Sequence, residues 1–98
     1  MACPVARTLD IIGDRWTILV IRDLLLNKTR RFQDFERSMP KLTPAVLSAR
    51  LKVLERNGII SSRMYVEHPP RPEYFLTEKG RQLRTVLLAM KQWGEKHA

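Results

Sequence analysis

The 98-residue chain has one cysteine, Cys3, and two histidines, His68 and His97. A lone cysteine cannot form a disulfide within the chain, and it excludes a cysteine-rich zinc site. No metal-ligand spacing and no glycine-rich phosphate loop occurs anywhere in the sequence. We therefore expect no metal, no cofactor and no catalytic residues, and the chain is not predicted to be an enzyme.

Long hydrophobic runs are also missing. The most apolar stretch, ILVIRDLLL, is interrupted by Arg22 and Asp23, whereas a membrane span needs about 18 apolar residues. The opening residues, MACPVARTLD, lack the apolar segment of a secretory signal. We expect a cytoplasmic chain without membrane contact. Its length predicts a single domain over residues 1–98, because domains cluster near about 100–150 residues.

Acidic residues are scarce relative to basic ones. There are 10 Asp and Glu against 18 Lys and Arg, which gives a net charge of +8. Residues 28–56 hold eight basic and three acidic side chains, so most of the excess lies in the middle third. A solvated surface is one interpretation of this excess, and a surface that binds a polyanion is the other.

Apolar periodicity and capping residues predict the order helix, helix, helix, helix, hairpin, helix. The four expected helices span residues 3–13, 15–27, 31–39 and 43–57, with residues 27–31 as a turn. Two β-prone runs at 59–68 and 73–77 form the hairpin, and one long helix follows Thr77 as its N-cap. The expected centre of the core is Trp16, Leu19, Ile21, Leu24 and Leu25.

The helix at 43–57 has the clearest signal. Thr43 is a good N-cap, Pro44 suits the first turn, and Gly58 ends the helix. At 100° per residue, Leu47, Leu51 and Leu54 share one face. The opposite face is small near its start and basic further along, with Ala45, Ser48, Ala49, Lys52 and Arg56.

The segment EHPPRPEYFL places Arg71 between two prolines, at the end of the hairpin. Proline fixes φ and lacks an N–H, so this segment is neither helix interior nor central strand. Such a tip projects Arg71 stiffly, either toward the minor groove or a phosphate of a duplex, or merely into solvent. A short helix, a capped helix and a hairpin predict a mainly α fold with a small β wing, a winged helix-turn-helix.

This fold favours DNA binding. A major groove about 12 Å wide admits one helix, and small side chains let its backbone approach the bases. Two rivals remain. A winged helix that binds protein would present large apolar anchors on its outer face, and an RNA-binding sheet would present stacked aromatics. The sequence shows alanine, serine and lysine on that helix face instead.

The chain resembles the HxlR-type family of bacterial transcription regulators, relatives of the MarR-like winged helices. The resemblance rests on CPV at 3–5, IIGDRWTILVIRDLL at 11–25, RRFQDFERSMP at 30–40, LTPAVLSARLKVLERNGII at 42–60, PPRPEYFLTEKG at 69–80 and Trp93–Gly94. It implies a homodimer whose helix opened by Thr43 reads the major groove, with Arg71 at the wing and Arg30 and Arg31 on the DNA backbone. We assign Pro44 and Arg50 to the same helix contacts, and Lys41 and His68 to the wing and backbone contacts.

The terminal helices favour a dimer, because they carry more apolar surface than a core of this size should absorb. The expected interface is Val5, Leu9, Leu83, Leu87, Met90 and Trp93. The other interpretation is that the last helix folds back on its own core. A symmetric pair reads two half-sites about 34 Å apart, so we expect an inverted-repeat operator. Operator sequence, regulated genes, repression or activation, and any small-molecule effector stay open.

Cys3 is the one candidate sensor. It precedes Pro4 at a helix start, where the helix dipole favours a thiolate, and Arg7 lies one turn on. The resemblance implies that some relatives sense oxidants or electrophiles at this position. With no second cysteine, a response needs an intersubunit disulfide, a small-thiol adduct or another modification. An unreactive N-terminal cysteine is the alternative.

Overall fold

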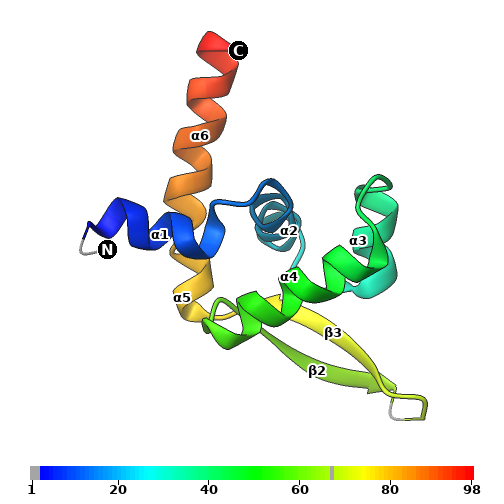
Figure 1. The fold of residues 1–98 in the computed structure, drawn as a ribbon. Coiled ribbons are helices and arrows are strands. Elements are labelled where there is room, and N and C mark those ends of the chain that lie inside the picture. Colours follow the sequence, from blue (N-terminus) through cyan, green and yellow to red (C-terminus); the bar gives the residue numbers. More distant parts are fainter. Residues whose placement is uncertain (1–2, 67) are drawn as a thin grey trace.

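The computed structural model describes residues 3–66 and 68–98. Figure 1 shows helices α1 and α2 at the N-terminal side, α3 and α4 beside them, a wing of paired strands, and α6 projecting away from the body. The elements are α1 Pro4–Ile12, α2 Arg15–Leu26, β1 Arg30–Arg31, α3 Phe32–Ser38, α4 Pro44–Arg56, β2 Ile60–Val66, β3 Arg71–Leu76, α5 Glu78–Arg81 and α6 Arg84–His97. The predicted winged helix-turn-helix is confirmed.

The wing is part of a three-stranded antiparallel sheet in the order β1-β3-β2. Strand β2 pairs with β3 from Ile60↔Leu76 outward, and β1 pairs with the other edge of β3 through Arg30↔Tyr74 and Arg31↔Glu73. The prediction of a turn at Arg30 and Arg31 was therefore wrong. These two arginines have little β-propensity of their own, and the exposed edge of β3 recruits them.

The prediction that the proline segment forms no central strand was also wrong, since Arg71–Leu76 is β3, the middle strand of the sheet. Pro72 fits there because β1 pairs only with Glu73 and Tyr74 and ends before it.

The core lies where α2, α3 and α4 meet the base of the sheet. Ile21 and Leu24 are buried as predicted, whereas Trp16, Leu19 and Leu25 are only partly buried. Helix α2 is apolar nearly all round, so its periodicity could not show which face meets α4. The largest fully buried side chains among the described residues are Phe35, Ile21, Leu47, Leu51, Leu54, Val20 and Thr17.

Tyr74 links the sheet to α3 and α4. Its ring centroid lies 6.2 Å from that of Phe35. Burial raises the pKa of the Tyr74 hydroxyl above its usual value, and the Glu55 carboxylate on α4 raises it further. Tyr74 thus contributes as a neutral phenol at the point where sheet and helices join.

The last helical segment is broken, although the sequence predicted one continuous helix after Thr77. Helix α5 ends at Arg81, and the Leu83 N–H donates to the Gly80 carbonyl three residues back, at 3.0 Å. This spacing is tighter than the four-residue α-helical pattern and turns the chain before α6 begins. Helix α5 stays on the sheet, and α6 leaves the body (Figure 1).

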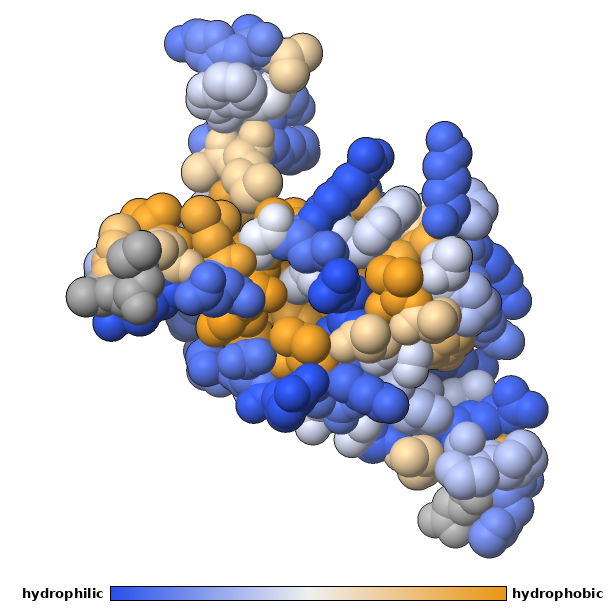
Figure 2. Space-filling view, viewed as in Figure 1, coloured by the Kyte–Doolittle hydropathy of each residue, from blue (hydrophilic) through white to orange (hydrophobic). Residues whose placement is uncertain are grey.

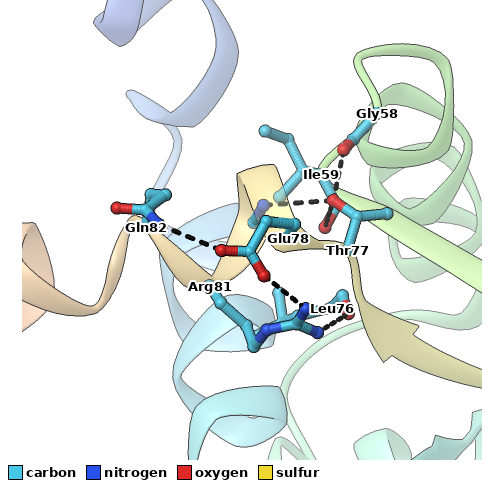
Figure 3. A network of polar contacts seen from close by, with 8 residues as sticks. Gly58, Ile59, Leu76, Thr77, Glu78, Arg81 and Gln82 are labelled. Atoms are coloured by element: carbon cyan, nitrogen blue, oxygen red, sulfur yellow. Dashed lines mark hydrogen bonds and ion pairs between the residues drawn. The ribbon is translucent and has the colours of Figure 1, made fainter.

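Thr77 fastens α5 to the end of α4. Figure 3 shows its hydroxyl between the Gly58 and Ile59 carbonyl oxygens, and it also accepts from the Gly80 N–H at 3.1 Å. On the other side of α5, Arg81 donates to the Leu76 carbonyl at 2.9 Å. These contacts join the C-terminal end of α4 to the base of the wing.

Glu78 completes this junction at the surface. Hydrogen bonds from Arg81 and Gln82, together with the charge of Arg81, hold the pKa of the Glu78 carboxyl below its usual value. The carboxylate accepts from Arg81 at 2.7 Å and from Gln82 at 3.2 Å (Figure 3). It is fully exposed, so its main effect is to orient Arg81 toward Leu76.

Gly80 should tolerate no side chain. A Cβ on Gly80 would lie 2.0 Å from the Ile59 carbonyl oxygen, whereas one on Gly94 meets nothing within 4 Å. We expect Gly80→Ala to lower the free energy of unfolding by about 1–3 kcal/mol, because backbone atoms must shift. The matched variant Gly94→Ala should leave it unchanged or raise it by up to about 1 kcal/mol. Urea denaturation at equal protein concentration measures both, and equal effects would contradict the close approach.

Candidate nucleic-acid interface

Helix α4 presents the face that the sequence assigned to DNA. The Thr43 hydroxyl accepts from the Val46 N–H at 3.3 Å, and Pro44 occupies the first turn. The leucine side faces inward: Leu47, Leu51 and Leu54 are all buried. On the opposite side Ala45, Ala49 and Lys52 are exposed and Ser48 is half-buried. The outward surface of α4 is therefore slim, with a cation one turn after Ser48.

Arg50 is placed differently from the rest of that set. Its guanidinium lies 3.2 Å from the Asp14 carboxylate, and both side chains are about one-third exposed. Asp14 also caps α2, since its carboxylate accepts from the Trp16 and Thr17 N–H groups. The Arg50 Nε is buried and has no hydrogen-bond partner among the described residues. Arg50 thus ties α4 to the start of α2.

Asp14 was not among the residues that the sequence singled out. An aspartate directly after Gly13 and before an apolar run is a recognisable N-cap signal. The pairing with Arg50, 36 positions later in the sequence, depends on the way α2 and α4 cross. No local pattern contains that information.

The wing extends from the body as β2 and β3, and Figure 1 shows its turn as the point farthest from α1. Arg71 is exposed and begins β3, where it pairs with Val66. His68, Pro69 and Pro70 form the exposed turn, while Glu67 lies outside the described residues. The structure therefore places Arg71 directly beside the tip, as the sequence predicted.

The predicted backbone-contacting residues divide into two groups. Arg31 and Lys41 are exposed. Arg30 is half-buried, and its Nε is buried without a hydrogen-bond partner among the described residues. Arg31 lies close to the wing, where its guanidinium carbon is 3.9 Å from the centroid of the Tyr65 ring.

Several cations of this surface form no ion pair with any described residue. The ion pairs within residues 3–66 and 68–98 are Arg22–Asp23, Arg37–Asp34, Arg50–Asp14, Arg63–Glu73 and Arg81–Glu78. Lys41, Lys52, Arg31 and Arg71 take part in none of them. Within the described residues, helix α4, the segment before it, the start of α3 and the wing tip thus contribute positive charge without an ion-pair partner, which suits the phosphates of a nucleic acid.

The terminal helices expose an apolar surface away from the wing. Figure 2 shows hydrophobic residues gathered over α1 and the base of α6, whereas the wing is mostly hydrophilic. We name this surface the α1–α6 patch. Its members are more than a third exposed: Val5 67%, Leu9 57%, Val86 38%, Met90 48% and Trp93 64%.

The predicted interface set is therefore split. Leu83 and Leu87 pack against the chain's own core, whereas Val5, Leu9, Met90 and Trp93 are exposed. Val86, which was not in the predicted set, falls on one stripe with Met90 and Trp93, four and three residues apart. Helix α6 has no buried residue at all among its 14.

Cys3 is the N-cap of α1 and is exposed. Its side chain makes no capping hydrogen bond, and Pro4 follows as the first helical residue. The thiol is therefore accessible to reagents from solvent.

Two other kinds of site are absent from the part of the chain that the structure describes. No three His, Cys, Asp or Glu side chains come close enough together there to hold a metal ion. None of its helices combines the length and the apolarity that crossing a bilayer requires.

Known helix-turn-helix regulators resemble the chain over most of its length. The family model of the HxlR-like helix-turn-helix matches residues 11–98. The chain is 46% identical over 95 residues to the HTH-type transcriptional regulator YdeP of Bacillus subtilis, covering 97% of this chain and 73% of that protein.

Solved structures of other regulators share the fold. The redox regulator HypR in its oxidized form has a TM-score of 0.88 and 40% identity, with 98% of each chain covered. The reduced form of the transcriptional regulator YodB from B. subtilis has a TM-score of 0.82 and 32% identity, covering all of this chain and 96% of that one.

Proposed function

The chain belongs to the HxlR-like helix-turn-helix family of transcription regulators, and from this premise we propose that it binds an inverted-repeat operator in double-stranded DNA, sequence-specifically and as a homodimer. A regulator of this kind acts in the cytoplasm, where bacterial DNA lies. Helix α4 enters the major groove, and the wing and Arg31 contact the backbone beside it.

The outer face of α4 carries the proposal. Ala45 and Ala49 are exposed on the side opposite the buried leucines, and Lys52 follows on the same side. A helix that lies in a groove about 12 Å wide must keep its outward side chains short near its N-terminal end. Lys52 then reaches a phosphate or a guanine.

A protein-binding winged helix is the competing function. Such a module relies on large apolar or aromatic anchors in its contact face. Val46 and Val53 on α4 are half-buried, and the fully exposed positions of the helix are alanine, proline, lysine, glutamate and arginine. This composition favours a polyanionic partner over a protein.

Two substitutions separate base reading from backbone contact. The operator is first selected from random duplexes with the wild-type protein. We expect Ala49→Trp to weaken operator binding about tenfold or more while non-specific binding persists, because the bulky ring holds α4 off the bases. Arg71→Ala should weaken binding to operator and scrambled duplex alike and lower the slope of log K against log salt by about 0.9.

The controls are matched to these variants. For Ala49→Trp the control is Ala49→Ser, which keeps a small side chain and should bind within about twofold of wild type. For Arg71→Ala the control is Lys96→Ala, which removes one charge from the exposed end of α6, away from the proposed DNA surface. Fluorescence anisotropy across a salt series gives the dissociation constants. Unchanged affinity of both Ala49→Trp and Arg71→Ala would contradict the docking, and a wild type that ignores every duplex in low salt would favour the protein-binding function.

The α1–α6 patch supports the homodimer. Exposed side chains of this size on both terminal helices leave apolar area that a second copy can cover, and a two-fold pair presents the same patch on each subunit. Helix α6 projects from the body (Figure 1), so it is accessible to a partner along its length.

Dimer formation is tested through Trp93. Wild type should run in solution with twice the 11.5 kDa mass of the chain. Trp93→Glu should shift the population toward the single-chain mass, because it places a charge in an apolar contact. Met64→Glu makes the same change at a residue that is 52% exposed but lies in the wing, and it should leave the mass unchanged. Light scattering after gel filtration measures all three, and a dimeric Trp93→Glu would place the interface elsewhere.

We further propose that Cys3 makes the regulator responsive to oxidants or electrophiles. The support is its exposed thiol at the start of α1, the helix that contributes Val5 and Leu9 to the α1–α6 patch. Solved relatives include HypR in an oxidized form and YodB in a quinone-bound form. In this chain, a modified Cys3 acts on DNA affinity through the subunit interface.

Treatment with a quinone or with diamide provides the test. The operator affinity of wild type should change by about threefold or more, since a group added at α1 alters how the subunits meet. Cys3→Ser should bind operator normally and show no change on treatment. A mass shift of the chain under non-reducing conditions distinguishes an adduct from an intersubunit disulfide. An equal response of wild type and Cys3→Ser would assign the effect to another group.

A further inference from the structure

Tyr65 occupies an irregular position in the wing. The register of the hairpin runs Met64↔Pro72 and then Val66↔Arg71, so β2 advances by two residues where β3 advances by one. Tyr65 is the residue between these two pairs. A bulge of this kind bends and twists the strand locally and often aims a side chain at a functional site.

The Tyr65 ring lies under Arg31. The guanidinium carbon of Arg31 is 3.9 Å from the ring centroid, which is close contact for a cation on an aromatic face. Tyr65 follows Arg31 by 34 positions, and the two residues belong to the two outer strands of the sheet, on either side of β3. The stack therefore spans the sheet and connects the start of α3 to the wing.

The backbone of Arg31 is held independently of its side chain. The residue pairs with Glu73 in the sheet, and its N–H donates to the Asp34 carboxylate at 2.9 Å. The side chain takes part in no ion pair among the described residues. Among the described residues, the Tyr65 ring is what orders the guanidinium, and no described group accepts a hydrogen bond from its N–H edges, so these edges can bind an anion.

A hollow of about 310 Å³ lies at this point, between α3 and the wing tip. Arg31 stands on its α3 side and Arg71 on its wing side, and Glu36 is the one carboxylate among the described residues that line it. The remaining lining residues are Phe32, Gln33, Tyr65, Pro70 and Pro72. Two cations from different elements face one opening, which suits a DNA backbone that passes between helix-turn-helix and wing.

We propose that Tyr65 is a positioning residue for DNA binding, which holds the Arg31 guanidinium at this hollow so that Arg31 and Arg71 contact the same stretch of duplex backbone. The inference rests on the proposed function. An unstacked arginine loses rotamer freedom when it binds a phosphate, and the stack has removed part of that freedom beforehand. It also fixes the spacing between the α3 contact and the wing contact.

A double-mutant cycle tests the proposal with full-length protein and the selected operator. Tyr65→Leu should weaken operator binding about two- to fivefold, the range expected from a cation–π contact at a surface. Tyr65→Phe keeps the aromatic face and should bind as wild type does. In an Arg31→Ala background, Tyr65→Leu should have no further effect, because the group that Tyr65 positions is gone.

A measurement without DNA completes the test. In wild type and Tyr65→Phe, the ring current of residue 65 should shift the Arg31 side-chain protons upfield in the NMR spectrum. In Tyr65→Leu this shift should disappear while the spectrum of α4 is unchanged. Circular dichroism melts of all variants show whether each is folded.

The outcomes separate this inference from the proposed function. A wild type that binds no duplex overturns the proposed function and this inference with it. Normal wild-type binding with an equal loss from Tyr65→Leu in both Arg31 backgrounds overturns the positioning role alone, since Tyr65 then acts through wing packing. Absence of the Arg31 ring-current shift in wild type also overturns it.

Discussion

The burial of one leucine stripe is the constraint on which the rest of the structure depends. Leu47, Leu51 and Leu54 are fully or almost fully removed from solvent, and burial of each contributes about 1.5–3 kcal/mol. Turning α4 by one residue would expose part of this stripe. The same packing therefore determines that Ala45, Ala49 and Lys52 face outward. The surface that the proposed function requires follows from the packing of the core.

The elements around α4 preserve that orientation. Asp14 caps α2 and pairs with Arg50, which connects α4 to the start of α2. At its other end α4 meets the wing through Thr77 and the Gly58 and Ile59 carbonyl oxygens (Figure 3). Tyr65 and Arg31 connect the wing to α3. Each predicted DNA-contacting element is thus held by polar or cation–π contacts, so that the contacts have a defined spacing before DNA arrives.

The fold also separates two kinds of surface. Unneutralised cations lie on α4, at the start of α3 and on the wing, whereas the exposed apolar side chains of α1 and α6 lie away from the wing (Figure 2). Helix α5 remains against the sheet, and α6 carries Met90 and Trp93 outward.

The sequence alone determined the order of the first four helices and the hairpin, the cap at Thr43, the inward leucines of α4 and the exposed Arg71, because capping, periodicity and proline chemistry are local properties. Only the tertiary structure decided that Arg30 and Arg31 form a strand, that Leu83 and Leu87 join the core while Trp93 does not, that Arg50 pairs with Asp14 and that Tyr65 lies under Arg31. These features join residues far apart in the chain. They depend on how helices cross and strands align, which no stretch of sequence specifies by itself.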